Sequence, residues 1–393
     1  MTYQEMCAFE VLYDAYLEAR KRKRSKPATA QYEANVLACT DKLSRLLQTK
    51  TYAPGKFETF YVYEPKKRLV QAPAFVDKVV LHALVDNILY DAITSSFIRD
   101  NYASQNRKGT HDGLFRLKQA MSEYYRKTGS ADGWVLKGDV HHFFASINHD
   151  VLKSKLWDLF EKHSLDPQLY DLLCIYIDTT PGLPLGYQTS QLFALLFLDH
   201  FDHLIKEGYQ IRWYGRYMDD FYIIHPDKKK LKALLREIRA YMADIGLELN
   251  SKTAIFPLRN GIDFLGFHTY LTDTGAVVQK LRQDSIDRMK GKVRYWRTAY
   301  PAGEVTKAEI IGSWIAWDAH AAHGDTYALR SKIAAEVGAI IGEDLKPRRK
   351  ITASPYVKQL RRLKQNRRHL QNQSAGSPPP SSEPRPAEIP PWD

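Results

Sequence analysis

IRWYGRYMDDFYIIH, residues 211–225, is the stretch that decides the fold. Apolar and aromatic residues flank the adjacent acids Asp219 and Asp220, which predicts two strands joined by a tight acidic turn. Adjacent acids usually mark a solvated turn. Here the flanks indicate a hairpin tip in mostly apolar surroundings, where two carboxylates are costly unless cations compensate their charge.

A third acid lies in a similar setting earlier in the chain. WVLKGD, residues 134–139, reads as a short apolar strand that ends in Asp139. Three carboxylates can hold two Mg²⁺ ions about 3.5–4 Å apart, the arrangement used for in-line phosphoryl transfer. We therefore expect Asp139, Asp219 and Asp220 to converge on two Mg²⁺ ions, which Mn²⁺ can replace. By spacing alone, the same trio would also suit a nuclease.

The elements around these strands indicate an α+β fold. Helical apolar spacing predicts two helices within residues 1–50, separated by a break at Pro27, and a long buried helix over residues 75–97. FETFYVYEPKKRLVQAP, residues 57–73, alternates as a β-hairpin does. Residues 281–345 read as a helical lobe. GxxxxGK[ST] and GxGxxG are both absent, which argues against NTPase and dinucleotide sites.

Composition narrows the partners and the compartment. No run of about eighteen apolar residues occurs, so we expect no transmembrane helix. The 3 cysteines show no CxxC spacing, which fits a reducing cytoplasm better than a disulfide framework. Of the formal charge of +12, most lies in residues 346–370, which have many Lys and Arg and no acid. That segment suits nucleic acid or, equally, a solvated charged helix.

Four motifs in order resemble those of a reverse transcriptase, and the resemblance runs from about residue 50 to about residue 335. They are GDVHHFFASINHD (138–150), GLPLGYQTSQLFALLFLD (182–199), RYMDDFYIIH (216–225), and LNSKT with GIDFLGF (249–267). The resemblance implies a right-hand polymerase with fingers, an antiparallel palm and a helical thumb. It also implies an RNA template, a DNA or RNA primer and dNTPs as partners; from the lack of a long apolar run we expect no membrane partner.

On this resemblance the chain divides into six segments. We expect an N-terminal helical extension, fingers, palm, helical thumb, a basic helical tail and a disordered Pro- and Ser-rich tail. In that order they cover residues 1–50, 51–133, 134–275, 276–345, 346–372 and 373–393.

The resemblance also assigns roles to residues. Phe144, five residues after Asp139, matches a steric gate against the ribose 2′-OH, although an ordinary core role beside Phe143 competes. Lys252 matches a lysine that protonates departing pyrophosphate. The other assignments are metal binding for Asp139, Val140, Asp219 and Asp220; nucleotide binding for Lys66, Arg68, Leu185, Gly186 and Gln191; and template or primer binding for Arg107, Lys108 and Gly266.

Within reverse transcriptases, the LGxxxSQ form around Leu185 resembles diversity-generating retroelements, where an apolar residue at this position is linked to error-prone copying of template adenines. SQLFAL and SQNRKGTH depart from that family's SQLFAN and CRKGKGTH-like forms. This leaves antiphage-defence reverse transcriptases that copy a noncoding RNA as an alternative. A small basic accessory protein or a structured noncoding RNA would fit either context.

Two alternatives differ in activity. An RNA polymerase of the same palm type would not use Phe144 as a gate. A non-enzymatic scaffold would bind structured RNA through residues 346–370, which retention of the three acids disfavours.

Overall fold

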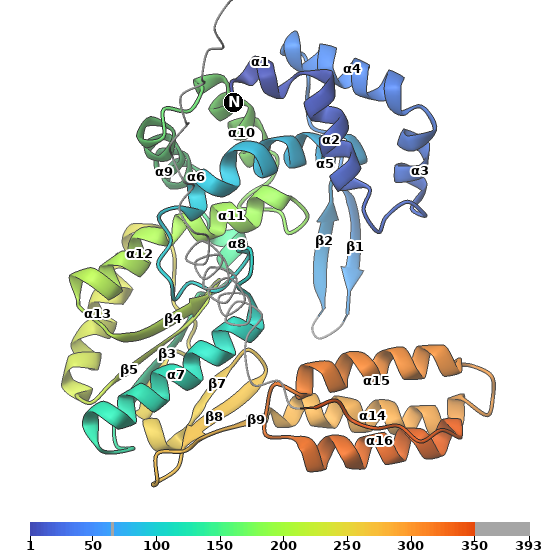
Figure 1. The fold of residues 1–393 in the computed structure, drawn as a ribbon. Helices are drawn as coiled ribbons and strands as arrows, with labels where there is room; N and C mark the ends of the chain where they lie inside the picture. The colour runs from blue at the N-terminus through green and yellow to red at the C-terminus, as the bar shows by residue number, and fades with distance from the viewer. Residues whose placement is uncertain (64–66, 350–393) are drawn as a thin grey trace, which may run out of the picture.

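The computed structural model describes residues 1–63 and 67–349. Its elements fall into an N-terminal helical part with a projecting hairpin, a central sheet covered by helices, and a C-terminal helical lobe (Figure 1). The basic tail and the Pro- and Ser-rich tail predicted after residue 349 lie outside the described residues. No helix in the described ranges has the length and apolar character needed to cross a membrane.

The N-terminal part contains more helices than the sequence predicted. The observed helices are α1 (Tyr3–Met6), α2 (Phe9–Ala19), α3 (Pro27–Ala34) and α4 (Val36–Gln48). Pro27 begins α3, where its missing N–H costs no helical hydrogen bond. The break that the sequence placed at Pro27 is therefore the loop before it, and a second break lies at Asn35, whose backbone is not helical.

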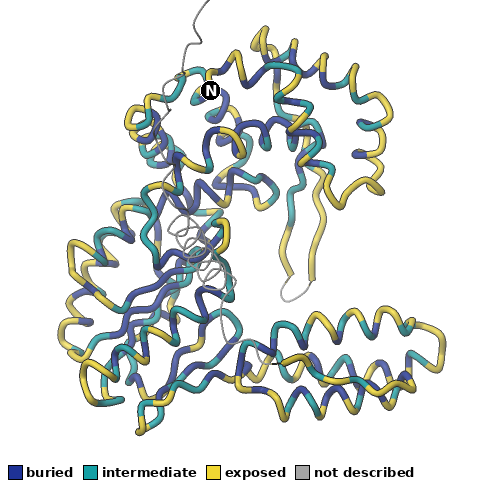
Figure 2. The backbone as a smooth tube through the Cα atoms, viewed as in Figure 1, coloured by how far each residue is buried: buried dark blue, intermediate teal, exposed yellow. Residues whose placement is uncertain are grey.

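The predicted hairpin is formed by β1 (Glu58–Val62) and β2 (Arg68–Ala72), which pair antiparallel. Most of its side chains are exposed, so it projects from the body of the protein (Figure 2). The predicted long helix follows as a continuous run of α5 (Phe75–Leu84), a π-helical turn η1 (Val85–Leu89) and α6 (Tyr90–Thr94).

The central sheet is antiparallel, in the order β4-β5-β3-β6. Its strands are β3 (Trp134–Asp139), β4 (Trp213–Tyr217), β5 (Asp220–His225) and β6 (Ala254–Pro257). Apolar residues of β3 and β5 are fully buried, because helices cover the sheet (Figure 2). The surrounding helices are α7 (Thr110–Thr128), α8 (Phe143–Ser146), α9 (His149–Lys162), α10 (Pro167–Ile177), α11 (Gln188–Phe197), α12 (Asp199–His203), η2 (Leu204–Gly208) and α13 (Lys228–Asp244).

Close packing in this sheet explains the glycine before Asp139. A Cβ on Gly138 would overlap the ring of Phe221 on the neighbouring strand. We expect Gly138→Ala to destabilise the protein by about 1–3 kcal/mol through overpacking. Gly291→Ala is the matched control, because a Cβ there meets no atom within 4 Å and should stabilise a helix by about 0.5–1 kcal/mol. Thermal unfolding of both variants measures this; equal melting temperatures would contradict it.

A second antiparallel sheet, β7-β8-β9, follows η3 (Leu258–Asn260) and connects to the C-terminal lobe. Its strands are β7 (Ile262–Phe264), β8 (Phe267–Leu271) and β9 (Val277–Leu281). Strand β9 was not predicted, and the expected start of the thumb at residue 276 falls just before this strand. Pairing of β9 with β8 associates residues 277–281 with the sheet instead of with the helical lobe.

The C-terminal lobe consists of α14 (Gln283–Ala299), α15 (Lys307–Ala321) and α16 (Tyr327–Ile341), as the helical spacing predicts. Its core includes Val293, Trp296, Trp314 and Val337. Figure 1 shows the β1–β2 hairpin extending from the N-terminal part toward α15.

Candidate active site

The three predicted acids lie at one end of the central sheet. The antiparallel register places Asp139, the last residue of β3, opposite Asp220, the first residue of β5. Tyr217 pairs with Asp220, so Met218 and Asp219 form the two-residue turn between β4 and β5. Met218 has a φ of 56°, a conformation that costs a residue with a Cβ about 1–3 kcal/mol and persists where the surroundings enforce it.

Electrostatics also connect Asp219 with Asp139. Burial raises the pKa of Asp219, and the nearby negative charge of Asp139 raises it further, while Arg68 and Lys137 act in the opposite direction. A buried carboxylate beside a second negative charge forms a site where a cation would be stabilising. Their metal-binding role stays a prediction.

Lys137 is a member of this site that the sequence analysis missed. It precedes Asp139 by two residues on β3, so both side chains lie on the same face. Its Nζ contacts Oδ1 of Asp220. Burial lowers the pKa of Lys137 to about 8, against the opposing effect of Asp139 and Asp219. The period of two along a strand was the signal that could have identified it.

The ammonium of Lys137 occupies one of the three carboxylates that were predicted to bind metal ions. Within residues 1–63 and 67–349, no group of three or more His, Cys, Asp or Glu side chains is arranged to hold a metal ion. In this structure Asp220 is instead paired with Lys137. For Asp139, Asp219 and Asp220 to bind metal ions together, Asp220 must therefore release the Lys137 ammonium and bind a metal ion in its place.

Asn250 is a second residue that the sequence analysis missed. Its backbone N–H donates to the carbonyl of Asp139 at 2.7 Å, and its Nδ2 donates to Oδ2 of Asp139 at 3.3 Å. A bridge between Val140 and Leu249 continues this pairing. Oδ1 of Asn250 accepts from the backbone N–H of Lys252 at 3.0 Å, which holds the predicted LNSKT segment beside Asp139.

This arrangement agrees with comparison to known proteins. Residues 63–269, more than half of the 393-residue chain, match the family described as "Reverse transcriptase (RNA-dependent DNA polymerase)". The chain belongs to the reverse transcriptase family. The description of this family names RNA-dependent DNA polymerases, which are nucleotidyltransferases, and the predicted α+β right-hand fold is confirmed. No protein among curated sequences matches it.

Solved structures that resemble this chain include two telomerases from Candida. Telomerase from Candida albicans, in complex with a TWJ fragment of telomeric RNA, is 15% identical with a TM-score of 0.44, over 74% of this chain and 53% of that chain. Apo telomerase from Candida Tropicalis, truncated from its C-terminal domain, is 13% identical with a TM-score of 0.42, over 59% and 58%. This reverse transcriptase therefore spans little more than half the length of either chain.

In the fingers of this reverse transcriptase, β2 begins with Arg68, whose positive charge opposes the rise in the pKa of Asp219. Arg68 of the hairpin is thus close enough to act electrostatically on Asp219. Lys66 lies outside the described residues. Lys67 lies over the ring of Tyr61, with its Nζ 4.4 Å from the ring centroid. The predicted triphosphate contact of Arg68 is compatible with this placement and is not tested by it.

Arg107 and Lys108, which were both predicted to bind template or primer, differ in their exposure. Arg107 is exposed and has a φ of 68°. Lys108 is half-buried, and its Nζ donates to the carbonyls of Ile98 and Asn101 at 3.3 and 3.0 Å. Burial lowers the pKa of Lys108 to about 8. Its ammonium contacts the loop in this structure, and the template or primer contact expected of Lys108 stays a prediction.

The two adjacent phenylalanines after Asp139 have different environments. Phe143 is 2% exposed and belongs to the core, whereas Phe144 is only partly buried. The carbonyl of Phe144 accepts from the backbone N–H of Leu183 at 2.7 Å, which attaches it to the second palm motif. This difference favours Phe144 over Phe143 as the residue that meets a nucleotide.

The second palm motif contacts the fingers. Leu185 is 42% exposed. A Cβ on Gly186 would overlap the carbonyl of Gln71 in β2, so only glycine allows this approach. Oε1 of Gln191 accepts from Oγ of Ser104 at 2.6 Å. Their nucleotide-binding roles are not tested by these contacts.

Gly266 lies in a two-residue turn between β7 and β8, and both Leu265 and Gly266 have positive φ. A Cβ on Gly266 would be 3.2 Å from Nε2 of His320, on α15 of the thumb. The predicted primer-binding turn therefore lies against the thumb.

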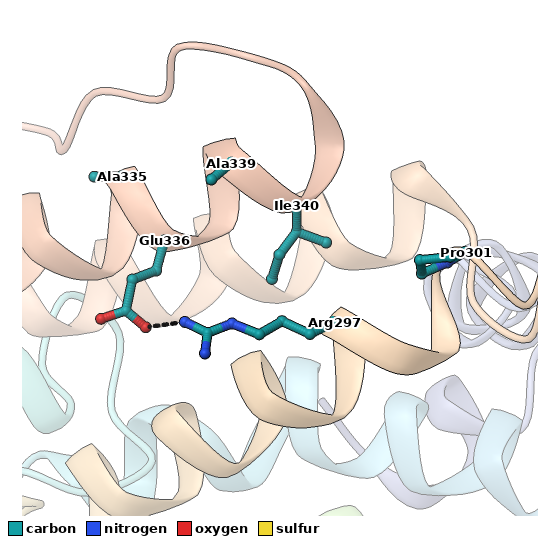
Figure 3. Close-up of a pocket in the computed structure, with 6 residues that line it drawn as sticks. All are labelled: Arg297, Pro301, Ala335, Glu336, Ala339 and Ile340. Atoms are coloured by element: carbon teal, nitrogen blue, oxygen red, sulfur yellow. Dashed lines mark hydrogen bonds and ion pairs between the residues drawn. The ribbon is translucent and has the colours of Figure 1, made fainter.

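A groove of about 620 Å³ lies between α14 and α16 of the thumb (Figure 3). Its lining consists of Arg297, Pro301, Ala335, Glu336, Ala339 and Ile340. Nη2 of Arg297 pairs with Oε2 of Glu336 at 3.1 Å, as the figure shows. None of the predicted site residues lines this groove.

Proposed function

We propose that this reverse transcriptase extends a DNA or RNA primer on an RNA template, using two Mg²⁺ ions held by Asp139, Asp219, Asp220 and the carbonyl of Val140. The placement of Asp139 opposite Asp220, with Asp219 at the adjoining turn, carries the proposal. Carboxylate and carbonyl oxygens suit Mg²⁺, and Mn²⁺ is expected to substitute. When bound, the ions activate the attacking hydroxyl and neutralise charge on the triphosphate and leaving pyrophosphate.

The protein's own residues would orient the reactants. Asn250 holds the carboxylate of Asp139 through its side chain. Arg68, close enough to affect the pKa of Asp219, would hold the triphosphate together with Lys66. Lys252 would protonate the departing pyrophosphate, and Phe144 would exclude a ribose 2′-OH. Arg107, Lys108 and Gly266 would contact template or primer.

Primer extension with purified protein tests this function. Matched primer–template pairs with an RNA or a DNA template strand are supplied with dNTPs and with Mg²⁺ or Mn²⁺. The proposal expects extension that depends on the divalent ion and proceeds on RNA. Absence of extension on RNA under all primer and metal combinations would contradict it.

For the biological role, we propose error-prone cDNA synthesis in a diversity-generating retroelement. The observation in its favour is the exposed Leu185, because an apolar side chain can pack but cannot hydrogen-bond an incoming sugar or template. The alternative is an antiphage-defence reverse transcriptase copying a noncoding RNA. Sequencing cDNA made in cells separates the two by template identity and by errors at template adenines.

Leu185→Gln should restore part of the lost discrimination. If the missing hydrogen bond is worth ~1–2 kcal/mol, errors at template adenines fall about 5- to 30-fold. Ile175→Gln, at an apolar residue of α10 that is 45% exposed, is the control and should leave the error rate unchanged. Wild-type cDNA with no excess of errors at adenines would contradict the diversification role.

A further inference from the structure

A fully buried ion pair connects the core to the acidic turn. Arg216 of β4 and Asp202 of α12 both have 0% exposed side chains. Nε and Nη2 of Arg216 donate to the two carboxylate oxygens of Asp202 at 2.7 and 2.6 Å. Nη1 of the same guanidinium donates to the carbonyl of Met218 at 2.7 Å. That carbonyl belongs to the peptide bond that joins Met218 to Asp219.

Further bonds hold this pair in place. Asp202 also accepts from the hydroxyl of Tyr214 at 2.5 Å and from Nδ2 of Asn101 at 3.2 Å. The backbone of Arg216 also bonds to the loop before α7. The N–H of Arg216 donates to the carbonyl of Asp100, and the N–H of Tyr102 donates to the carbonyl of Arg216. The guanidinium therefore has little freedom to move, and neither does the Met218 carbonyl that it binds.

Stability does not explain why such a pair is present. Burying two charges loses their hydration, and well-packed apolar residues of similar volume are often as stabilising. What an apolar pair could not supply is a donor for the Met218 carbonyl. Met218 has a positive φ, which a residue with a Cβ adopts where its surroundings enforce it.

We propose that Arg216 and Asp202 are positioning residues for catalysis: the guanidinium, oriented by Asp202, fixes the Met218 carbonyl and so the directions in which Asp219 and Asp220 leave the turn. This rests on the proposed function, in which those two acids hold the metal ions. Fixed carboxylates bind ions without a reorganisation cost at the moment of reaction. Loss of the bond to Met218 should therefore weaken metal use and the chemical step, while primer–template binding stays unchanged.

The thumb supplies a matched control. Arg330 and Asp318 form another buried ion pair, with side chains 0% and 1% exposed and Nη1 of Arg330 2.9 Å from Oδ1 of Asp318. Nη1 of Arg330 also donates to the carbonyl of Arg348, so this pair attaches the chain after α16 and not the acidic turn. Replacement of either pair by apolar residues should perturb folding to a similar degree.

The experiment compares Arg216→Met/Asp202→Leu with Arg330→Met/Asp318→Leu in the full chain, with Arg216→Lys as a milder variant. Melting temperatures monitor folding, and single-turnover primer extension is measured across Mg²⁺ concentrations. We expect the Arg216 double variant to extend about 10- to 100-fold more slowly, with about a 10-fold higher Mg²⁺ concentration at half-maximal rate. Arg216→Lys can keep the ion pair with Asp202 but cannot also reach the Met218 carbonyl as the guanidinium does. Its extension rate and Mg²⁺ dependence should therefore change in the same direction.

The thumb variant should keep the wild-type Mg²⁺ dependence, whatever its melting temperature. The proposal is overturned if Arg216→Lys and the Arg216 double variant both keep wild-type rate and Mg²⁺ dependence, or if the thumb variant shows the same Mg²⁺ shift. Asp219→Asn distinguishes failure of the proposed metal site from failure of the proposed positioning role. If it stays active, the proposed metal site itself fails; if it is inactive while the Arg216 variants behave as wild type, only the positioning role fails.

Discussion

Asp219→Asn should lower the rate of primer extension by about 10³-fold or more, which corresponds to about 4 kcal/mol of transition-state stabilisation. The reason is the loss of one of the three carboxylates that the account assigns to the metal ions. Single-turnover extension on an RNA template with saturating dNTP and Mg²⁺ measures it. Asp244→Asn, at an exposed acid of α13, is the control and should keep wild-type activity.

Although Asp219→Asn should lose activity, we expect it to be as stable as the wild type or more stable in the absence of Mg²⁺. Burial and the charge of Asp139 raise the pKa of Asp219, so its ionised form is disfavoured in the folded protein. Removing that charge should leave the melting temperature without Mg²⁺ unchanged or higher, and should reduce the stabilisation that added Mg²⁺ provides. A large loss of melting temperature in Asp219→Asn would assign this residue to folding and would leave the activity loss uninformative.

Phe144→Ala should reduce discrimination against ribonucleotides by about 100-fold, because the ring that would meet the 2′-OH is removed. The ratio of dNTP to rNTP incorporation, measured as kcat/KM for each, checks this. Phe143→Ala is the matched control one residue away. Because Phe143 is buried in the core, its truncation should cost about 3–5 kcal/mol of stability with little effect on sugar selection.

Two different results for Phe144→Ala and Phe143→Ala would contradict the steric-gate assignment in different ways. If Phe143→Ala alters sugar selection and Phe144→Ala does not, the register assigned to the two rings is wrong. If the wild-type enzyme incorporates ribonucleotides as readily as deoxynucleotides, the gate is absent, and the enzyme behaves as an RNA polymerase of this palm type.

The sequence predicted the central hairpin and the neighbouring strand well, because strong apolar patterns on both sides of two short acidic segments leave few other arrangements. Antiparallel pairing of those strands then brings Asp139 beside Asp220. A helical lobe over residues 281–345 was also predicted, without its division into α14, α15 and α16. By contrast, β9 was missed, since the short segment VVQKL lies next to a long helical pattern and its pairing partner is a matter of tertiary structure.

Side-chain partners were harder to predict than elements. Nothing in the sequence indicates that Arg216 pairs with Asp202 on a separate helix, or that Asn250 donates to Asp139. The loop contacts of Lys108 were not predictable either, because the sequence gives its charge and not the direction of its ammonium, which donates to loop carbonyls. Lys137 was predictable in principle, because it shares the strand face of Asp139, but its contact with Asp220 depends on the register of two strands.

The central claim is that Asp139, Asp219 and Asp220 jointly hold two divalent ions. Anomalous scattering from Mn²⁺, in crystals of the enzyme with an RNA template, a primer and a non-hydrolysable dNTP, tests it most directly. We expect two manganese peaks about 3.5–4 Å apart, bounded by these three carboxylates, with Asp220 released from Lys137. A nucleotide bound with Asp220 still paired to Lys137, and with no manganese peak at the three acids, would contradict it.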